Sequence, residues 1–244
     1  MKILEGIKVT RRFGGLTALY NVDFCVNEGE IVGLIGPNGA GKTTLFNVIT
    51  GAIPVTSGVI KFEGRNITGL GAHKICKLGI ARTFQVPKPF PRMSVYENIL
   101  AAATFGRDKS DKSSNLKQEI HQIMEKFGLT SKSETSASNL AVFEQRMLEI
   151  ARALATKPKL LLLDEVMAGL NPKEATQAVK IIKELRDSGI TIFMIEHNMR
   201  VIMGVSDRII VLNQGMKIAD GKPEEVSKDI KVIEAYLGEA YVGS

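Results

Sequence analysis

The chain has 244 residues but no tryptophan, only two cysteines and only three histidines. It contains no apolar run of about 18 residues and does not begin like a signal peptide. We therefore expect a soluble, intracellular chain, which still allows docking on a membrane protein. Cys25 and Cys76 lie far apart without the spacing of metal ligands, so two buried, reduced thiols are expected.

The net charge of +6, from 32 basic and 26 acidic residues, is mild and spread along the chain. It suits phosphate ligands or a location beside a membrane and is only a weak argument for nucleic acid, which we do not expect as a partner. Tryptophan is absent, and no segment of the sequence has the mixture of aromatic and basic residues expected of a binding surface for single-stranded nucleic acid. The length and near-average composition predict one α/β domain, residues 1–244, with a full hydrophobic core.

The most informative segment begins at Gly36 and fits the pattern G-x-x-x-x-G-K-[ST] without mismatch. Apolar residues 30–35 precede it, as in a buried parallel strand, and residues 45–50 follow at helical spacing up to Gly51. Strand, glycine loop and helix together indicate a phosphate loop rather than a turn that binds nothing. The residues expected to hold a nucleoside triphosphate are Gly36, Pro37, Asn38, Gly39, Ala40, Gly41, Lys42, Thr43 and Thr44.

The residue types explain this chemistry. Glycines let the backbone curl until several N–H groups face phosphate oxygens, beside the positive end of a helix. Lys42 is expected to reach the β- and γ-phosphates, and the Thr43 hydroxyl to bind Mg²⁺.

The pattern of the remaining chain predicts an α/β core with a helical insertion. Short β-rich runs before residue 87 read as an antiparallel layer beside the first parallel strand. After Gly106 comes a polar stretch, residues 108–114, then an apolar helical pattern from Leu116 to Phe127. We expect core segments 1–87 and 156–244 and a helical subdomain 88–155. Strands are predicted at 160–163 and 191–195, a helix at 173–188 and a hairpin around 213–215.

Two strand ends carry candidate catalytic groups. Leucines 160–163 end at Asp164 and Glu165, a placement that lets Asp164 bind Mg²⁺ and Glu165 polarise the attacking water as general base. Alone, such a pair is as often a solvated turn; behind a phosphate loop we favour the functional reading. The strand at 191–195 delivers His197, usually a structural position, but here expected beside the γ-phosphate.

This order of elements resembles the ATP-binding subunit of ABC transporters, over essentially the whole chain. The resemblance implies that Phe13 stacks on adenine and that Gln85 contacts Mg²⁺ and water at the start of the helical subdomain. It also implies that His197 is a switch histidine and that residues 168–171 cross to a partner subunit. Implied cofactors are ATP and Mg²⁺.

One segment departs from the family pattern. The signature, best known as L-S-G-G-Q, falls at Leu140 to Glu144, where Ala141 replaces the serine and Val142 and Phe143 replace the two glycines. In the family this segment caps the γ-phosphate of the opposite subunit. Either the family tolerates a loose signature, or this chain completes its partner's ATP site poorly; the sequence leaves both open.

Several segments, including residues 45–51, 79–85, 164–172 and the tail 232–239, resemble the high-affinity branched-chain amino acid importer type. This implies a nucleotide-sandwich dimer with a second ABC ATPase subunit, identical or different. It further implies integral membrane permease subunits, an external solute-binding protein and a peripheral place on the cytoplasmic face of the membrane. Closure is then transmitted through Gln85 and the proline-rich residues 87–91.

Three alternatives remain. Relatives that move urea, short amides or lipopolysaccharide share much of this pattern. A soluble, non-transport ABC ATPase is disfavoured because neither a long coiled coil nor a second cassette is present. A module that binds ATP without hydrolysing it is disfavoured because Glu165 and His197 are both there.

Overall fold

The computed structural model describes residues 1–108 and 115–237, in two compact units. The first comprises residues 1–72 together with 191–237, and the second residues 73–190. Part of the predicted polar stretch 108–114 and the end of the tail, Gly238 and Glu239, lie outside the described residues.

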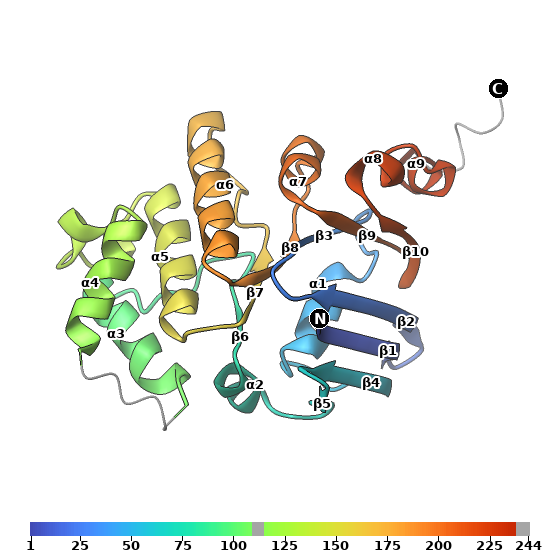
Figure 1. Ribbon diagram of the computed structural model, residues 1–244, viewed down its shortest axis with the longest axis horizontal. Coiled ribbons are helices and arrows are strands. Elements are labelled where there is room, and N and C mark those ends of the chain that lie inside the picture. The colour runs from blue at the N-terminus through green and yellow to red at the C-terminus, as the bar shows by residue number, and fades with distance from the viewer. Residues whose placement is uncertain (109–114, 238–244) are drawn as a thin grey trace. The chain divides into compact units, whose positions relative to one another are not determined.

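An antiparallel sheet forms one layer of the first unit, with strand order β2-β1-β4-β5. Its long strands lie side by side in Figure 1. Buried residues alternate along β2 from Val22 to Val26, whereas β1 buries the adjacent pairs Ile3–Leu4 and Val9–Thr10. The predicted antiparallel layer is therefore a separate sheet. Its strands are β1 (Lys2–Phe13), β2 (Leu16–Asn27), β4 (Ser57–Phe62) and β5 (Arg65–Asn66).

A second set of strands in this unit runs in the order β10-β9-β3-β8. The strand β3 is parallel to both β8 and β9, and all five residues of β3 and of β8 are buried. Such unbroken apolar runs are typical of strands covered on both faces. The strands are β3 (Ile31–Ile35), β8 (Thr191–Ile195), β9 (Arg208–Asn213) and β10 (Met216–Gly221), and the helices are α1 (Lys42–Ile49), α7 (Met199–Val205), α8 (Pro223–Val226) and α9 (Ile230–Leu237).

The predicted hairpin around 213–215 is confirmed. Gln214 and Gly215 both have positive φ, 46° and 77°, as a tight two-residue turn between twisted strands requires.

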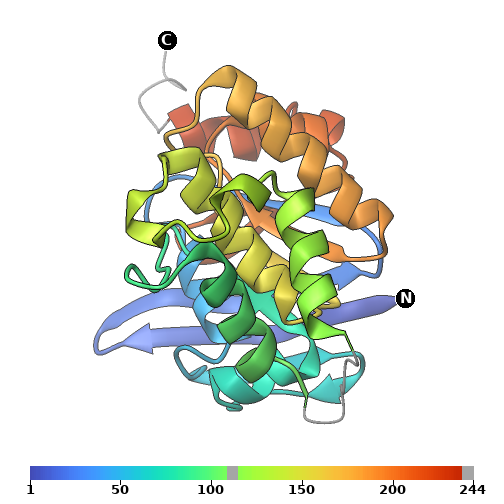
Figure 2. The same cartoon turned by 90° about the vertical axis from the view of Figure 1, so that its left-hand side faces the viewer.

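The second unit contains the parallel pair β6 (Ile80–Arg82) and β7 (Leu160–Asp164) and most of the helices. Helices α3, α4 and α5 pack against one another (Figure 2). Ser94 and Glu97 form a complete capping box at the start of α3. The helices are α2 (Ala72–Leu78), α3 (Val95–Gly106), α4 (Leu116–Lys126), α5 (Val142–Ala155) and α6 (Pro172–Asp187), with single 3₁₀ turns at Thr130–Lys132 and Ala137–Asn139.

One expectation is wrong in part. Cys25 and Cys76 are both free, but each is half-buried rather than buried. Burial still raises the pKa of the Cys76 thiol, so it stays protonated.

Within residues 1–108 and 115–237, no helix is both long and apolar enough to cross a membrane.

The contact between Gly6 and Phe24 provides a test of this packing. A Cβ on Gly6 would lie 2.0 Å from Cε1 of the buried Phe24 ring, which stacks on Phe193. We expect Gly6→Ala to destabilise the fold by about 1–3 kcal/mol, the usual cost of overpacking. Gly15→Ala is the control, because nothing lies within 4 Å of a Cβ there. Urea unfolding of both variants measures the difference; equal stabilities would contradict the packing.

Candidate functional site

The phosphate loop leaves the end of β3 and leads directly into α1. Its first glycine has φ 148°, and a Cβ there would lie 2.0 Å from the carbonyl oxygen of Leu212. At Gly41, with φ 101°, a Cβ would lie 2.7 Å from the carbonyl oxygen of Ala18. Only glycine fits these two positions, so crowding by neighbouring strands imposes the curled path of the loop.

The ammonium group of Lys42 lies inside this curl. Its Nζ donates to the carbonyl oxygens of Gly36, at 2.7 Å, and Pro37, at 3.0 Å, and the side chain is buried. A buried cation surrounded by backbone turns, at the first residue of a helix, is a suitable environment for phosphate oxygens. The loop therefore fits the triphosphate that the sequence predicts for it.

Strand pairing brings His197 to the same edge as the phosphate loop. Leu34 pairs with Ile195 in parallel register, so β3 and β8 end together and the loop and His197 follow directly. The imidazole is exposed, two residues before α7 begins. This is the arrangement expected of a side chain that reaches a bound γ-phosphate.

Phe13 is the last residue of β1, on the antiparallel sheet of the same unit. Its ring is 44% exposed, and the Arg11 guanidinium lies over it, 4.4 Å from the centroid. The open face of such a ring can stack on an aromatic base.

The other predicted residues belong to the second unit. The Gln85 amide Nε2 donates to the Glu165 carboxylate Oε2 at 2.9 Å, so these two catalytic candidates are neighbours. Glu165 follows β7 with φ 51°, a left-handed conformation that is uncommon outside glycine and often found at functional sites. The backbone thus turns immediately after Asp164.

An ion pair with Arg82 holds Asp164. Nη2 of Arg82 lies 2.6 Å from Oδ2 of the buried carboxylate, and the Asp164 amide donates to the Thr83 hydroxyl oxygen at 3.0 Å. The parallel register of β6 and β7, in which Arg82 pairs with Leu162, places these groups together. Sequence reasoning gave Arg82 no role, because a contact between two strand ends depends on their register.

Three side chains of α5 hold the segment around Gln85. The Glu149 carboxylate accepts the Phe84 N–H at 2.7 Å, and Nη1 of Arg146 donates to the Gln85 carbonyl at 2.8 Å. One turn further on, Nη1 of Arg152 donates to the Lys88 carbonyl at 2.8 Å. Burial raises the pKa of Glu149 to about 7, against the opposing hydrogen bond and arginine charges. Sequence analysis missed this clamp; its only signal was arginines and a glutamate three residues apart on one helix.

The degenerate signature lies at the start of α5, as predicted. Ala141 is the N-cap residue and has no side-chain acceptor, so only half of a capping box forms, from the Ala141 N–H to the Glu144 carboxylate at 2.9 Å. Val142 is 56% exposed and Phe143 is half-buried. The free N–H groups of this helix end therefore lie beside two bulky apolar side chains.

The predicted magnesium ligands are too few to bind the ion alone. Among the described residues, no group of three or more His, Cys, Asp or Glu side chains gathers as a metal site. Thr43, Gln85 and Asp164 supply one hydroxyl, one amide and one carboxylate. Mg²⁺ commonly takes one or two protein ligands and completes its shell with water and substrate phosphates, so each of these oxygen ligands suits it by its chemistry.

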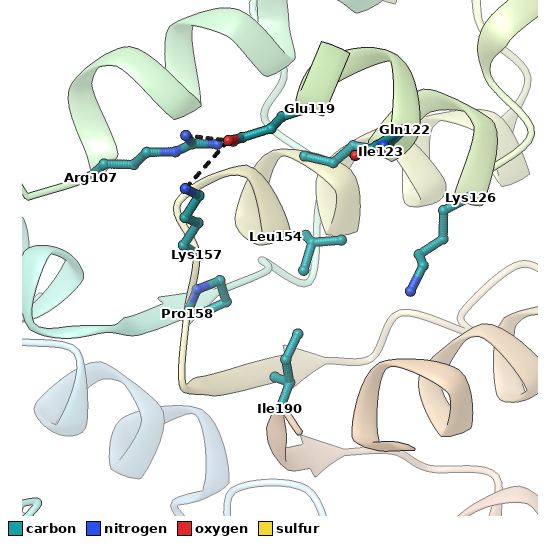
Figure 3. A pocket seen from close by; sticks show the side chains of 9 residues that line it. All are labelled: Arg107, Glu119, Gln122, Ile123, Lys126, Leu154, Lys157, Pro158 and Ile190. Atoms are coloured by element: carbon teal, nitrogen blue, oxygen red, sulfur yellow. Dashed lines mark ion pairs between the residues drawn. The ribbon is translucent and has the colours of Figure 1, made fainter. Parts of the chain in front are cut away.

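A separate cavity of about 390 Å³ lies in the second unit (Figure 3). Glu119 pairs there with Arg107, at 2.7 Å, and Lys157, at 3.5 Å, above an apolar floor that includes Leu154 and Ile190. None of the predicted site residues lines it, and the one carboxylate of Glu119 is set against three cationic side chains, Arg107, Lys126 and Lys157.

Comparison with known proteins agrees with this chemistry. The family model described as "ABC transporter" matches residues 19–168. A second model, "Branched-chain amino acid ATP-binding cassette transporter", matches residues 216–242.

Three curated relatives are similar over nearly their full length. The high-affinity branched-chain amino acid transport ATP-binding protein BraF of Pseudomonas aeruginosa is 43% identical over 98% of both chains. The corresponding protein LivG of Salmonella typhimurium is 45% identical over 94% of this chain and 95% of its own. The lipopolysaccharide export system ATP-binding protein LptB of Escherichia coli is 36% identical over 99% of both.

Two solved structures are informative. The ADP conformation of MJ1267, an ATP-binding cassette of an ABC transporter, is 34% identical with a TM-score of 0.88, over 98% of this chain and 100% of its own. The dimeric post-hydrolysis state of the cassette MJ0796, bound to ADP and Pi, is 25% identical with a TM-score of 0.81, over 90% and 98%. The predicted nucleotide-binding α/β fold is confirmed.

The buried Glu149 predicts a pH-dependent stability. Its pKa is about 7 in the folded chain against an ordinary 4.5, so the folded state binds the extra proton between these values. Stability should fall by about 3 kcal/mol as the pH rises from 4.5 to 7. Glu149→Gln should remove this fall. Urea unfolding across that pH range measures it, with the exposed Glu125→Gln as control; an unchanged slope in Glu149→Gln would refute the assignment.

Proposed function

This chain belongs to the ATP-binding proteins of ABC transporters, and from that premise we propose that it powers an importer of branched-chain amino acids. It is an ABC ATPase that binds nucleotide. The observation that supports branched-chain amino acids as the substrate is the match of residues 216–242 to the branched-chain amino acid cassette model. This segment is independent evidence, because the general ABC transporter model matches only residues 19–168. BraF and LivG support the same class.

We assign nucleotide binding to the first unit. Residues 36–44 hold the phosphates, Phe13 stacks on the adenine, and Lys42 exchanges its carbonyl partners for phosphate oxygens. Thr43, Gln85 and Asp164 hold Mg²⁺, which neutralises phosphate charge when bound. These roles follow from the chemistry of the side chains and their local geometry.

We assign the proton chemistry of hydrolysis to Glu165, Gln85 and His197. The Glu165 carboxylate acts as general base toward a water molecule, and the hydrogen bond from Gln85 fixes the orientation of that carboxylate. The His197 imidazole, two residues beyond the end of β8, orients the water or the phosphate.

The proposed assembly is a sandwich dimer with a second ABC ATPase subunit, and the dimeric state of MJ0796 supports this arrangement. The other partners are integral membrane permease subunits and, indirectly, an external solute-binding protein, which places the chain on the cytoplasmic face of the membrane. We propose residues 88–155 as the helical subdomain that meets the permease and the rest as the core.

Replacement of the general base tests the function. We expect Glu165→Gln, in cells that lack the wild-type chain, to abolish uptake of labelled leucine. In the purified complex it should slow phosphate release by about 10²–10⁴-fold and leave ATP binding intact. Glu125→Gln is the matched control. Wild-type hydrolysis by Glu165→Gln would reject Glu165 as the base.

A lipopolysaccharide role is the second candidate, since LptB is also similar over the whole chain. Cells with Glu165→Gln that take up leucine normally but lose surface lipopolysaccharide would favour it. Loss of urea or short-amide uptake alone would point to those solutes.

A substitution in the signature segment tests whether the two ATP sites of the proposed dimer, each formed by both subunits, are equally active. We expect Phe143→Gly to raise the ATPase rate of the assembled complex, on the order of tenfold for one regained hydrogen bond, because the α5 N–H groups become accessible. Glu125→Gln, an exposed residue outside the signature, is again the control. An unchanged rate for Phe143→Gly would support a signature that is loose but functional.

A further inference from the structure

The C-terminal helix α9 contacts the phosphate loop through one side chain. The backbone N–H of Gly36 donates to the phenolic oxygen of Tyr236 at 2.7 Å, although the two residues are far apart in the sequence. Both belong to the first unit. Burial raises the pKa of the phenol, so the hydroxyl stays neutral.

The structure gives the N–H of Gly36 the Tyr236 hydroxyl as its acceptor. Gly36 is buried, and the Leu212 carbonyl occupies the space where a Cβ would be, so the backbone has little freedom to move. A buried N–H without an acceptor carries the full cost of its lost hydration. The Tyr236 hydroxyl thus holds the backbone at Gly36, the residue at which the phosphate loop begins.

The same helix also lines a hollow with α7. A cavity of about 540 Å³ has Met199 and Met203 of α7 on one side and Val232, Ile233 and Tyr236 of α9 on the other. Helix α7 begins two residues after His197. The position of α9 is therefore coupled both to the phosphate loop and to the segment that follows the switch histidine.

We propose that Tyr236 is a positioning residue that holds the phosphate loop in its nucleotide-binding conformation, so that docking of α9 sets the affinity for ATP. The inference rests on the proposed nucleotide role of the loop. It goes beyond that role because helix α9, which is not among the proposed nucleotide-binding residues, is given the role of positioning Gly36.

Tyr236→Phe tests the hydroxyl while it keeps the ring. We expect ATP to bind the purified chain about five- to tenfold more weakly, the contribution of one part-buried hydrogen bond. Hydrogen exchange of the Gly36 amide should quicken in the absence of nucleotide. Tyr96→Phe is the control, because that ring contacts His121 in the second unit. Wild-type affinity and wild-type exchange in Tyr236→Phe would overturn the proposal.

A second variant separates positioning from general stability. Ile233→Ala loosens α9 and should also weaken ATP binding, but it should add nothing once Tyr236→Phe is present, since both act through one hydrogen bond. Additive effects would overturn the coupling. If the wild-type chain fails to bind ATP at all, the proposed function fails; if it binds and Tyr236→Phe matches it, only the role of Tyr236 fails.

Discussion

The buried ammonium of Lys42 is the group on which the phosphate loop depends. A buried charge is costly unless it is hydrogen-bonded, and here the carbonyls of Gly36 and Pro37 accept its protons. The loop must curl to bring both carbonyls to one side chain, and that curl is possible only with glycine beside Leu212 and Ala18. The arrangement that satisfies Lys42 without nucleotide also preforms a phosphate site.

In the second unit, a buried negative charge is likewise stabilised by a nearby partner. Its buried charge is the Asp164 carboxylate, neutralised by Arg82 on the neighbouring strand. In the proposed site, a triphosphate would replace the carbonyl partners of Lys42 and a cation would replace Arg82 at Asp164, so the net free-energy gain from each contact would be modest.

The elements around the loop were predictable because their signals are local. Strands β3, β7 and β8 are unbroken apolar runs, α1 follows the glycine loop, and the 213–215 turn matches its sequence. The pairs Arg82–Asp164 and Gly36–Tyr236 were not predictable, because they depend on strand register and on chain segments far apart in sequence. The exposure of the two cysteines was misjudged for the same reason, since composition does not report neighbours. The subdomain boundaries 88–155 stay a prediction.

Helix α5 links the signature residues 141–143 to the backbone around Gln85, although these belong to two separate sequence motifs. Its first turn carries the signature residues, and the next turns carry Arg146 and Glu149, which bond the backbone on either side of Phe84 and Gln85. Gln85 in turn bonds Glu165. Because an α-helix is stiff over this length, a displacement of the signature end must move the Gln85 backbone with it. The identity of residues 141–143 therefore bears on Glu165, the proposed general base, as well as on the partner's nucleotide in the proposed dimer.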